Sequence, residues 1–216
     1  MIEIIKSAAA EITIDPKEVA VYLGYYSANG IDEKTILDGI SEFGDNSDFR
    51  ACCVRVPVRI TENGVDLGFM QIESKSLYKN LDGCDDAYVL AATTGINSQR
   101  LIERNSVISP IKGMVTDSIG SAAIEAFCDY INRRVGDTDY LRPRFSPGYG
   151  DLSLDCQQTL LDFLEAKKHI GLALTESCML TPVKSVTAII GLSNEKNKCR
   201  NKKGCMVCNR ANCPYS

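Results

Sequence analysis

The stretch VTDSIGSAAIEAFCDYINRRV, residues 115–135, has the hydrophobic spacing of a long helix with one apolar side. Its large apolar positions recur every four residues, at Ile119, Ala123, Phe127 and Ile131. Residues at this spacing share one face of an α-helix, so the pattern predicts a helix packed on a core. Such a helix needs a sheet or further helices to cover its apolar side.

The segments around this helix alternate between strand and helix patterns. The β-rich runs 51–60 and 65–72 flank Asn63-Gly64, a dipeptide typical of hairpin turns. Residues 86–95, 141–150, 172–177 and 185–192 also resemble strands, and helices are predicted at 17–25, after Asp32, at 74–81 and at 156–169. We therefore predict an α+β fold: one mixed domain with antiparallel strands and a long helix over residues 1–193, plus a small cysteine-rich tail over residues 194–216.

Composition and charge limit the function classes. The chain has 216 residues, of which 44% are hydrophobic, enough for a core, and it lacks a long apolar run or a signal-peptide pattern. We expect a cytoplasmic protein that does not bind a membrane. The net charge is −4, but residues 194–216 carry six basic residues and one acid, so the remainder is strongly acidic. An acidic body argues against nucleic acid as the main partner.

The ten cysteines fall into two groups. Six are scattered among apolar residues, where buried free thiols are expected: Cys52, Cys53, Cys84, Cys128, Cys156 and Cys178. Four lie close together in the tail, with the spacing Cys-x5-Cys-x2-Cys-x4-Cys: Cys199, Cys205, Cys208 and Cys213. Four converging thiolates suit either a tetrahedral zinc ion or an iron–sulfur cluster. The plain alternative is a cysteine-rich tail without a metal.

Three segments, in order, resemble a known family. Arg144-Phe-Ser-Pro-Gly-Tyr149 matches an Arg-x-x-x-Gly-Tyr pattern. Upstream lies the helix pattern AIEAFCDYINRRV (123–135), and downstream lies LTESCMLTPVKSV (174–186). Together they resemble the activation, or reactivation, domain of cobalamin-dependent methionine synthase. The chain departs from that family after Tyr149, where Gly150-Asp151 replaces the usual proline.

The resemblance implies an S-adenosylmethionine site with assigned roles. Arg144 would hold the ligand carboxylate through two parallel hydrogen bonds, and Glu125 would offer an anion to the ammonium or sulfonium. Gly148 would let the backbone approach the ligand, while backbone groups near Ser146 recognise the adenine. Tyr149 would stand beside the reacting methyl group as the candidate catalytic residue. Without the flanking segments, a Pro-Gly turn with a surface arginine and a packing tyrosine would be the better explanation of the motif.

The family's activity implies partners. Oxidised cob(II)alamin on the synthase is rescued by one-electron reduction and methylation from S-adenosylmethionine. The chain has no Asp-x-His-x-x-Gly motif for the corrinoid, and its one histidine, His169, is expected near a helix C-terminus. Cobalamin would therefore be carried by a separate methionine synthase or corrinoid protein. The electron would come from a donor such as flavodoxin or ferredoxin.

These expectations leave three functions open. The first is a reactivation factor whose tail carries an iron–sulfur cluster, with [4Fe–4S] favoured over zinc because such clusters reach low potentials. The second is a non-catalytic S-adenosylmethionine-binding or docking module with a structural zinc tail. The third, a basic zinc tail that binds RNA, is disfavoured because no aromatic residues interleave the tail's basic ones.

Overall fold

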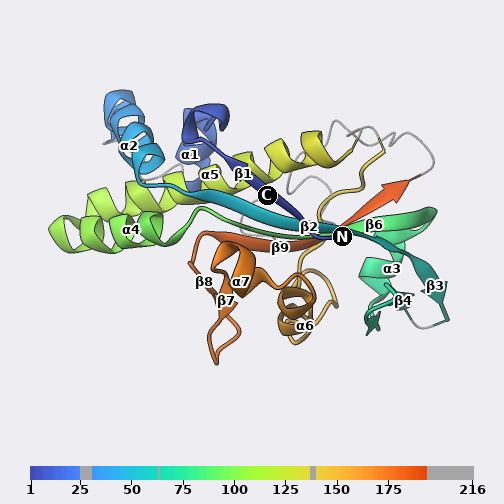
Figure 1. Cartoon of the computed structure of the whole chain (residues 1–216). Helices are drawn as coiled ribbons and strands as arrows, with labels where there is room; N and C mark the ends of the chain where they lie inside the picture. The colour runs from blue at the N-terminus through green and yellow to red at the C-terminus, as the bar shows by residue number, and fades with distance from the viewer. Residues whose placement is uncertain (25–30, 63, 137–139, 194–216) are drawn as a thin grey trace.

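The protein is described from a computed structural model that covers residues 1–24, 31–62, 64–136 and 140–193. Its centre is a four-stranded antiparallel sheet in the order β1-β2-β6-β9. The strands are β1 (Glu3–Ser7), β2 (Phe49–Pro57), β6 (Cys84–Thr93) and β9 (Ser185–Ser193). Helices cover both faces of this sheet (Figure 1). The predicted mixed α+β domain is confirmed.

Side chains alternate between two hydrophobic cores, one on each face of the sheet. In β2, Ala51 and Cys53 belong to one core while Cys52 and Val54 belong to the other. This alternation follows from the period of two in a strand. Because both faces are buried, the strand is apolar along most of its length rather than alternating with polar residues.

The first face is covered by three helices (Figure 1): α1 (Pro16–Tyr22), α2 (Glu33–Asp45) and α5 (Pro110–Val135). Aspartates begin the first two, because Asp15 accepts the Lys17 N–H at 2.9 Å and Asp32 accepts the Thr35 N–H at 2.7 Å. The predicted α5 stripe is confirmed, and all four of its residues are fully buried: Ile119, Ala123, Phe127 and Ile131. A 3-10 turn, η1 (Ala9–Glu11), follows β1.

The helix α4 (Ile96–Ile108) packs along the first turns of α5. Ser109 ends α4 and caps α5, so the two helices form a hairpin. Their close approach is possible because Gly113 faces Ser106, where a Cβ would lie 2.5 Å from the Ser106 hydroxyl oxygen. Inside this contact Asn105 donates a hydrogen bond of 3.0 Å to Thr116. The sequence pattern did not predict α4, nor did it predict β1.

The second face is covered by α3 (Lys75–Leu81), α6 (Cys156–Phe163) and α7 (Ala166–Ile170), as Figure 1 shows. Two small antiparallel sheets flank it. One contains β3 (Arg59–Thr61), β4 (Gly64–Asp66) and β5 (Gln71–Ile72), and the other contains β7 (Ala173–Leu174) and β8 (Leu180–Thr181). The chain predicted as one helix over 156–169 divides at Glu165, whose φ of +46° is left-handed.

The predicted hairpin at residues 61–64 is confirmed, since Thr61 pairs with Gly64. Gly64 was expected to form part of the turn, but it is required for close packing instead. It lies in β4, where a Cβ would come within 2.0 Å of the Ile72 carbonyl oxygen. The run predicted as one strand over 51–60 divides at Val58, which lies between β2 and β3 and donates its N–H to the carbonyl of Asp85 in β6 at 2.8 Å.

The scattered cysteines are free thiols, as predicted, but they are not all buried. Cys52, Cys53, Cys84 and Cys128 are buried, whereas Cys156 and Cys178 are half-exposed. Burial raises the pKa of Cys52 to about 12, so this thiol stays protonated at neutral pH.

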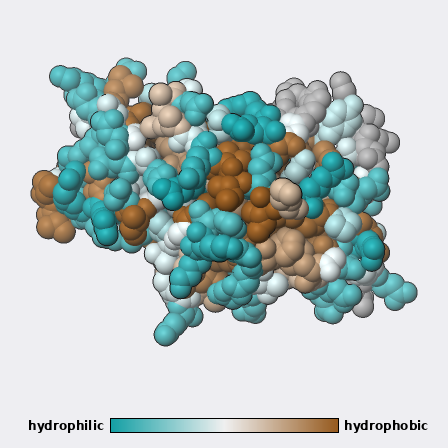
Figure 2. All heavy atoms as spheres, viewed as in Figure 1, coloured by the Kyte–Doolittle hydropathy of each residue, from teal (hydrophilic) through white to brown (hydrophobic). Residues whose placement is uncertain are grey.

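Figure 2 shows hydrophobic residues along the middle of this view, between more polar surfaces above and below. Within the described ranges, no helix is long and apolar enough to cross a membrane.

Candidate functional site

Residues 141–145 form a fifth, irregular line beside β9. Leu141 and Phe145 make isolated antiparallel bridges to Leu192 and Ile189, and the Phe145 N–H donates to the Ile189 carbonyl at 2.9 Å. The segment was predicted to be strand-like, but only Leu141 and Phe145 form bridges to β9. They hold Arg144 at the edge of the central sheet, beside α5.

The Arg144 guanidinium is held between two carboxylates of α5. Its Nη2 lies 2.6 Å from Glu125 Oε2, and its Nη1 lies 2.7 Å from Asp129 Oδ1. The two acids are four residues apart and so project from the same side of the helix. The Arg144 side chain is only 19% exposed, so these contacts are shielded from water more than an ordinary surface pair.

This environment keeps Arg144 charged and Cys128 neutral. Burial by itself lowers the pKa of Arg144, but the Cys128 sulfur and the carboxylates of Glu125 and Asp129 together raise that pKa above its ordinary value. Burial raises the pKa of the adjacent Cys128 thiol to about 12. The cluster of Arg144, Glu125 and Asp129 therefore carries one net negative charge at neutral pH.

The motif continues into a tight turn that requires glycine. Gly148 has a φ of +90° and donates its N–H to the Leu152 carbonyl at 2.8 Å. The Tyr149 N–H donates to the Ser146 carbonyl at 3.0 Å. The Tyr149 side chain is 56% exposed, and its ring meets the Phe145 ring edge-on with centroids 6.0 Å apart. An aromatic surface thus opens to solvent beside the cluster.

Asp151 anchors the end of this turn to α3. Its carboxylate accepts the Ser74 hydroxyl at 2.5 Å, the Lys75 N–H at 2.9 Å and the Ser76 N–H at 3.0 Å. The Ser74 and Ser76 hydrogen bonds hold the pKa of Asp151 well below its ordinary value. These contacts explain why Asp151 follows the motif here.

Gly150 fits the same anchor. It has a φ of +56°, and a Cβ at this position would lie 2.5 Å from the Ser76 hydroxyl oxygen. Gly150 and Asp151 therefore both serve the contact between the turn and α3, because the first leaves room for Ser76 and the second accepts its N–H.

The downstream segment is fixed to α5 by Lys184. Its ammonium group lies 2.9 Å from Asp117 Oδ1 and 2.9 Å from the Ser121 hydroxyl. The stem of Lys184 passes over Gly120, where a Cβ would lie 2.9 Å from its Cγ. These contacts hold the start of β9 beside α5. Residues 174–186, predicted as a strand pair, contribute the end of the β7–β8 hairpin and the beginning of β9.

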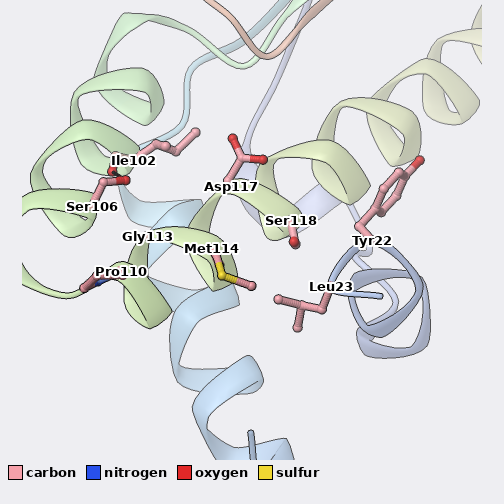
Figure 3. Close-up of a pocket in the computed structure, with 9 residues that line it drawn as sticks. All are labelled: Tyr22, Leu23, Ile102, Ser106, Pro110, Gly113, Met114, Asp117 and Ser118. Carbon is pink, nitrogen blue, oxygen red and sulfur yellow. Dashed lines mark hydrogen bonds between the residues drawn. The ribbon is translucent and has the colours of Figure 1, made fainter. Parts of the chain in front are cut away.

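A cavity of about 380 Å³ lies beside the first turns of α5, which precede Glu125 and Asp129 in that helix (Figure 3). Residues of α4 and α5 form most of its lining, and Tyr22 and Leu23, at the end of α1, close one side. Its volume is within the range of small-molecule sites, which starts at about 300 Å³.

Comparisons with known proteins bear on this arrangement. Residues 129–199 match the family model described as "Vitamin B12 dependent methionine synthase, activation domain". The fold matches a solved structure entitled "Crystal Structure of the MetH Reactivation Domain bound to AdoHcy", with a TM-score of 0.67 and 13% sequence identity. That match covers 91% of this chain and 80% of the other. This chain has the activation-domain fold of methionine synthase. No curated protein matches the sequence.

The activation-domain family segment contains much of the site described above. It begins at Asp129 and runs through Arg144 and the glycine turn to β9. Glu125 lies one helical turn before the matched segment. The structure brings the predicted residues Glu125 and Arg144 into direct contact and places Ser146, Gly148 and Tyr149 in the adjoining turn.

Sequence reasoning missed three residues of this candidate site. Asp129 could have been found, because it stands four residues after Glu125 on the same helix. Asp151 and Tyr22 carried no such pattern, since each reaches its place through contacts between distant elements. Tyr22 is an electrostatic neighbour of Glu125, Tyr149 and Arg144.

The predicted tail ligands Cys199, Cys205, Cys208 and Cys213 lie outside the described residues. Among the residues that are described, no group of three or more His, Cys, Asp or Glu side chains could hold a metal ion. His169 lies in the last turn of α7, as expected, with its Nε2 3.4 Å from Glu165.

Proposed function

We propose that this chain binds S-adenosylmethionine at the Arg144 turn and supports reductive methylation of cob(II)alamin on a separate methionine synthase or corrinoid methyltransferase. The observation that carries the proposal is the Arg144 guanidinium clamped between Glu125 and Asp129, beside a glycine turn, on the activation-domain fold. The solved relative was determined with S-adenosylhomocysteine bound, which is the demethylated form of the proposed ligand.

The charges of the cluster complement those of the ligand. S-adenosylmethionine carries a carboxylate, an ammonium and a sulfonium, and so has one net positive charge at neutral pH. The cluster carries one net negative charge. A guanidinium has five N–H donors, and the two acids engage one on each terminal nitrogen, so three remain to hold the ligand carboxylate. Glu125 and Asp129 would then face the ammonium or sulfonium.

The protein's contribution to methyl transfer would be positioning. Arg144 and the turn are fixed by the bridges to β9, by the two α5 acids and by the Asp151 anchor on α3. A donor held by such a rigid site keeps its methyl group aimed in one direction, which lowers the entropic part of the barrier. The exposed ring of Tyr149 would stand beside that methyl group and limit access of water.

The partner would supply the cobalamin, which accepts one electron and then the methyl group while S-adenosylhomocysteine is released. In a one-electron couple, the population of the reduced form falls about tenfold for each ~59 mV by which the donor's potential is too high. Irreversible methylation removes the reduced form as it appears, so an unfavourable reduction can still go forward. A donor such as flavodoxin or ferredoxin would provide the electron.

We further propose that the four tail cysteines bind a [4Fe–4S] cluster that passes electrons toward the corrinoid, with zinc as the alternative. The spacing of the four thiols in the sequence supports a metal site. Anaerobic purification of the full chain, followed by iron, sulfide and zinc analysis, tests this. We expect iron and acid-labile sulfide with a reducible cluster; stoichiometric zinc without iron contradicts the electron-transfer role.

The whole proposal is tested by mixing the full chain with a cob(II)alamin-loaded methionine synthase that lacks its own activation domain, a reductant and methyl-labelled S-adenosylmethionine. We expect labelled methylcobalamin to form, and Arg144→Ala to abolish its formation. Arg55→Ala serves as the matched control, because Arg55 is an exposed residue of β2 that forms an ion pair with Asp86 of β6. Binding of the donor without methylcobalamin would support the docking-module alternative instead.

A further inference from the structure

Tyr22 lines the cavity and is also an electrostatic neighbour of Glu125 and Arg144 in the cluster. It is the last residue of α1, a helix anchored on α5 by the buried side chains of Val19 and Leu23. Figure 3 shows the Tyr22 ring directed along α5 toward its later turns, while Leu23 points toward Met114. Tyr22 as a whole is 49% exposed, so one part of the residue is buried against the protein and another part faces solvent.

The cavity and the cluster follow each other along one face of α5. Ser118 lines the cavity, and Glu125 and Asp129 hold Arg144. The spacings of seven and four residues place all three on the same side of the helix, with Ser118 and Glu125 about 10 Å apart along its axis. A ligand that lies along this face would pass the Tyr22 ring.

The electrostatic neighbours of Tyr22 support this placement. Burial raises the pKa of Tyr22 to about 12, and the charges of Glu125, Glu18 and Tyr149 contribute in the same direction, while Arg144 opposes them. The hydroxyl therefore lies within electrostatic reach of the cluster and stays neutral at physiological pH. A neutral tyrosine ring presents a negative π-face that attracts cations.

We infer that Tyr22, together with Tyr149, lines the path of the sulfonium and makes this site select the charged methyl donor over its neutral demethylated product. This inference rests on the proposed S-adenosylmethionine site. A sulfonium gains from aromatic rings and from the net negative cluster, whereas the thioether of S-adenosylhomocysteine gains from neither. Tyr22 is a specificity-determining residue in this account.

Tighter binding of the donor than of the product would favour release of the product after methyl transfer. When the methyl group passes to the partner's reduced corrinoid, whose electron pair forms the new bond to carbon, the carbon–sulfur bond breaks, its electron pair stays on sulfur and the ligand loses its positive charge. The attraction of the rings and of the acids for that charge disappears in the same step, so the product is held less tightly than the donor.

Calorimetric titration of the full chain with S-adenosylmethionine and with S-adenosylhomocysteine tests the inference. The wild type should bind the donor more tightly. Tyr22→Leu should weaken donor binding about 3- to 10-fold, the range of a partly exposed cation–π contact, and leave product binding unchanged. Tyr22→Phe keeps the ring and should keep the ratio of the two affinities. Tyr78→Leu, which changes an exposed tyrosine on α3, is the matched control.

Two results would overturn the inference while leaving the proposed site intact. One is equal binding of the donor and the product by the wild type, and the other is a ratio of the two affinities that Tyr22→Leu leaves unchanged. Binding of neither ligand by the wild type would overturn the proposed function together with this inference. Thermal unfolding of each variant confirms that the comparison is made on folded protein.

Discussion

Arg144 Nη2 and Glu125 Oε2 lie 2.6 Å apart, and this contact joins the edge of the central sheet to the long helix α5. Arg144 comes from the irregular segment beside β9, and Glu125 comes from the middle of α5. The pair links the glycine turn to the longest helix in the described part of the chain. The same contact brings opposite charges together at a partly shielded surface, which is the pattern that a zwitterionic ligand needs.

Neutralising Glu125 should weaken this junction. In Glu125→Gln the Arg144 guanidinium loses one of its two anionic partners while it remains largely shielded from water. We expect the free energy of unfolding to fall by about 1 kcal/mol, at the low end for a hydrogen bond to a charged group because Glu125 is partly exposed. Urea unfolding measures this change.

The matched control is Asp86→Asn, which removes the anion from the exposed Arg55 pair. That pair should contribute less than about 0.5 kcal/mol, as solvent-exposed ion pairs generally do. Equal losses in the two variants would show that Arg144 is no better shielded than an ordinary surface arginine.

The Asp151 anchor predicts a pH dependence of stability. The pKa of Asp151 is depressed in the folded state, so its contribution is present above the ordinary carboxyl pKa of about 4 and is lost as pH falls toward the folded value. Asp151→Asn should therefore have a lower Tm than the wild type at pH 7. The gap should narrow below about pH 4. Calorimetric melts from pH 7 to pH 2.5 provide the test; a gap that stays constant over this range argues against the anchor.

A side chain at Gly150 should separate the turn from α3. Gly150→Ala places a non-glycine residue at positive φ and pushes its Cβ against Ser76. Gly171 has a similar φ of +70°, but a Cβ added there would meet no atom within 4 Å. Gly171→Ala therefore measures the cost of the backbone conformation alone. We expect a loss of about 1–2 kcal/mol for Gly171→Ala and a further loss of about 1–3 kcal/mol for Gly150→Ala.

Chemical denaturation of the two alanine variants checks this order. The double variant Gly150→Ala with Ser76→Gly removes the clashing side chain and should recover part of the difference. Equal stabilities of the two single variants would mean that the close packing of the turn on α3 contributes nothing.

Local sequence patterns predicted much of the fold. The α5 stripe, the helix that follows Asp32 and the hairpin at Thr61 all depend on residues close together in sequence, and all are present. The helix α4 escaped prediction because polar residues interrupt its apolar positions, and two of them, Ser98 and Asn105, are buried in hydrogen bonds. Such burial depends on a partner helix that local spacing does not reveal.

The candidate site was predictable where chemistry follows a motif and unpredictable where it follows packing. Arg144, Gly148 and Tyr149 were predicted together from one short segment, and the structure places Gly148 and Tyr149 in the turn that follows Arg144. Asp151 binds residues more than seventy positions away, and Tyr22 reaches the cluster only because α1 packs on α5. Contacts of this kind are set by the tertiary fold, so no local pattern could indicate them.

The central claim is that Arg144 holds the amino-acid end of S-adenosylmethionine, and calorimetric titration of the full chain tests it most directly. The wild type and the Arg55→Ala control should bind the donor at one molecule per chain. Arg144→Ala should weaken binding at least about tenfold, the scale of losing a charged hydrogen-bonding partner. Donor binding with the same affinity in folded Arg144→Ala would contradict the account.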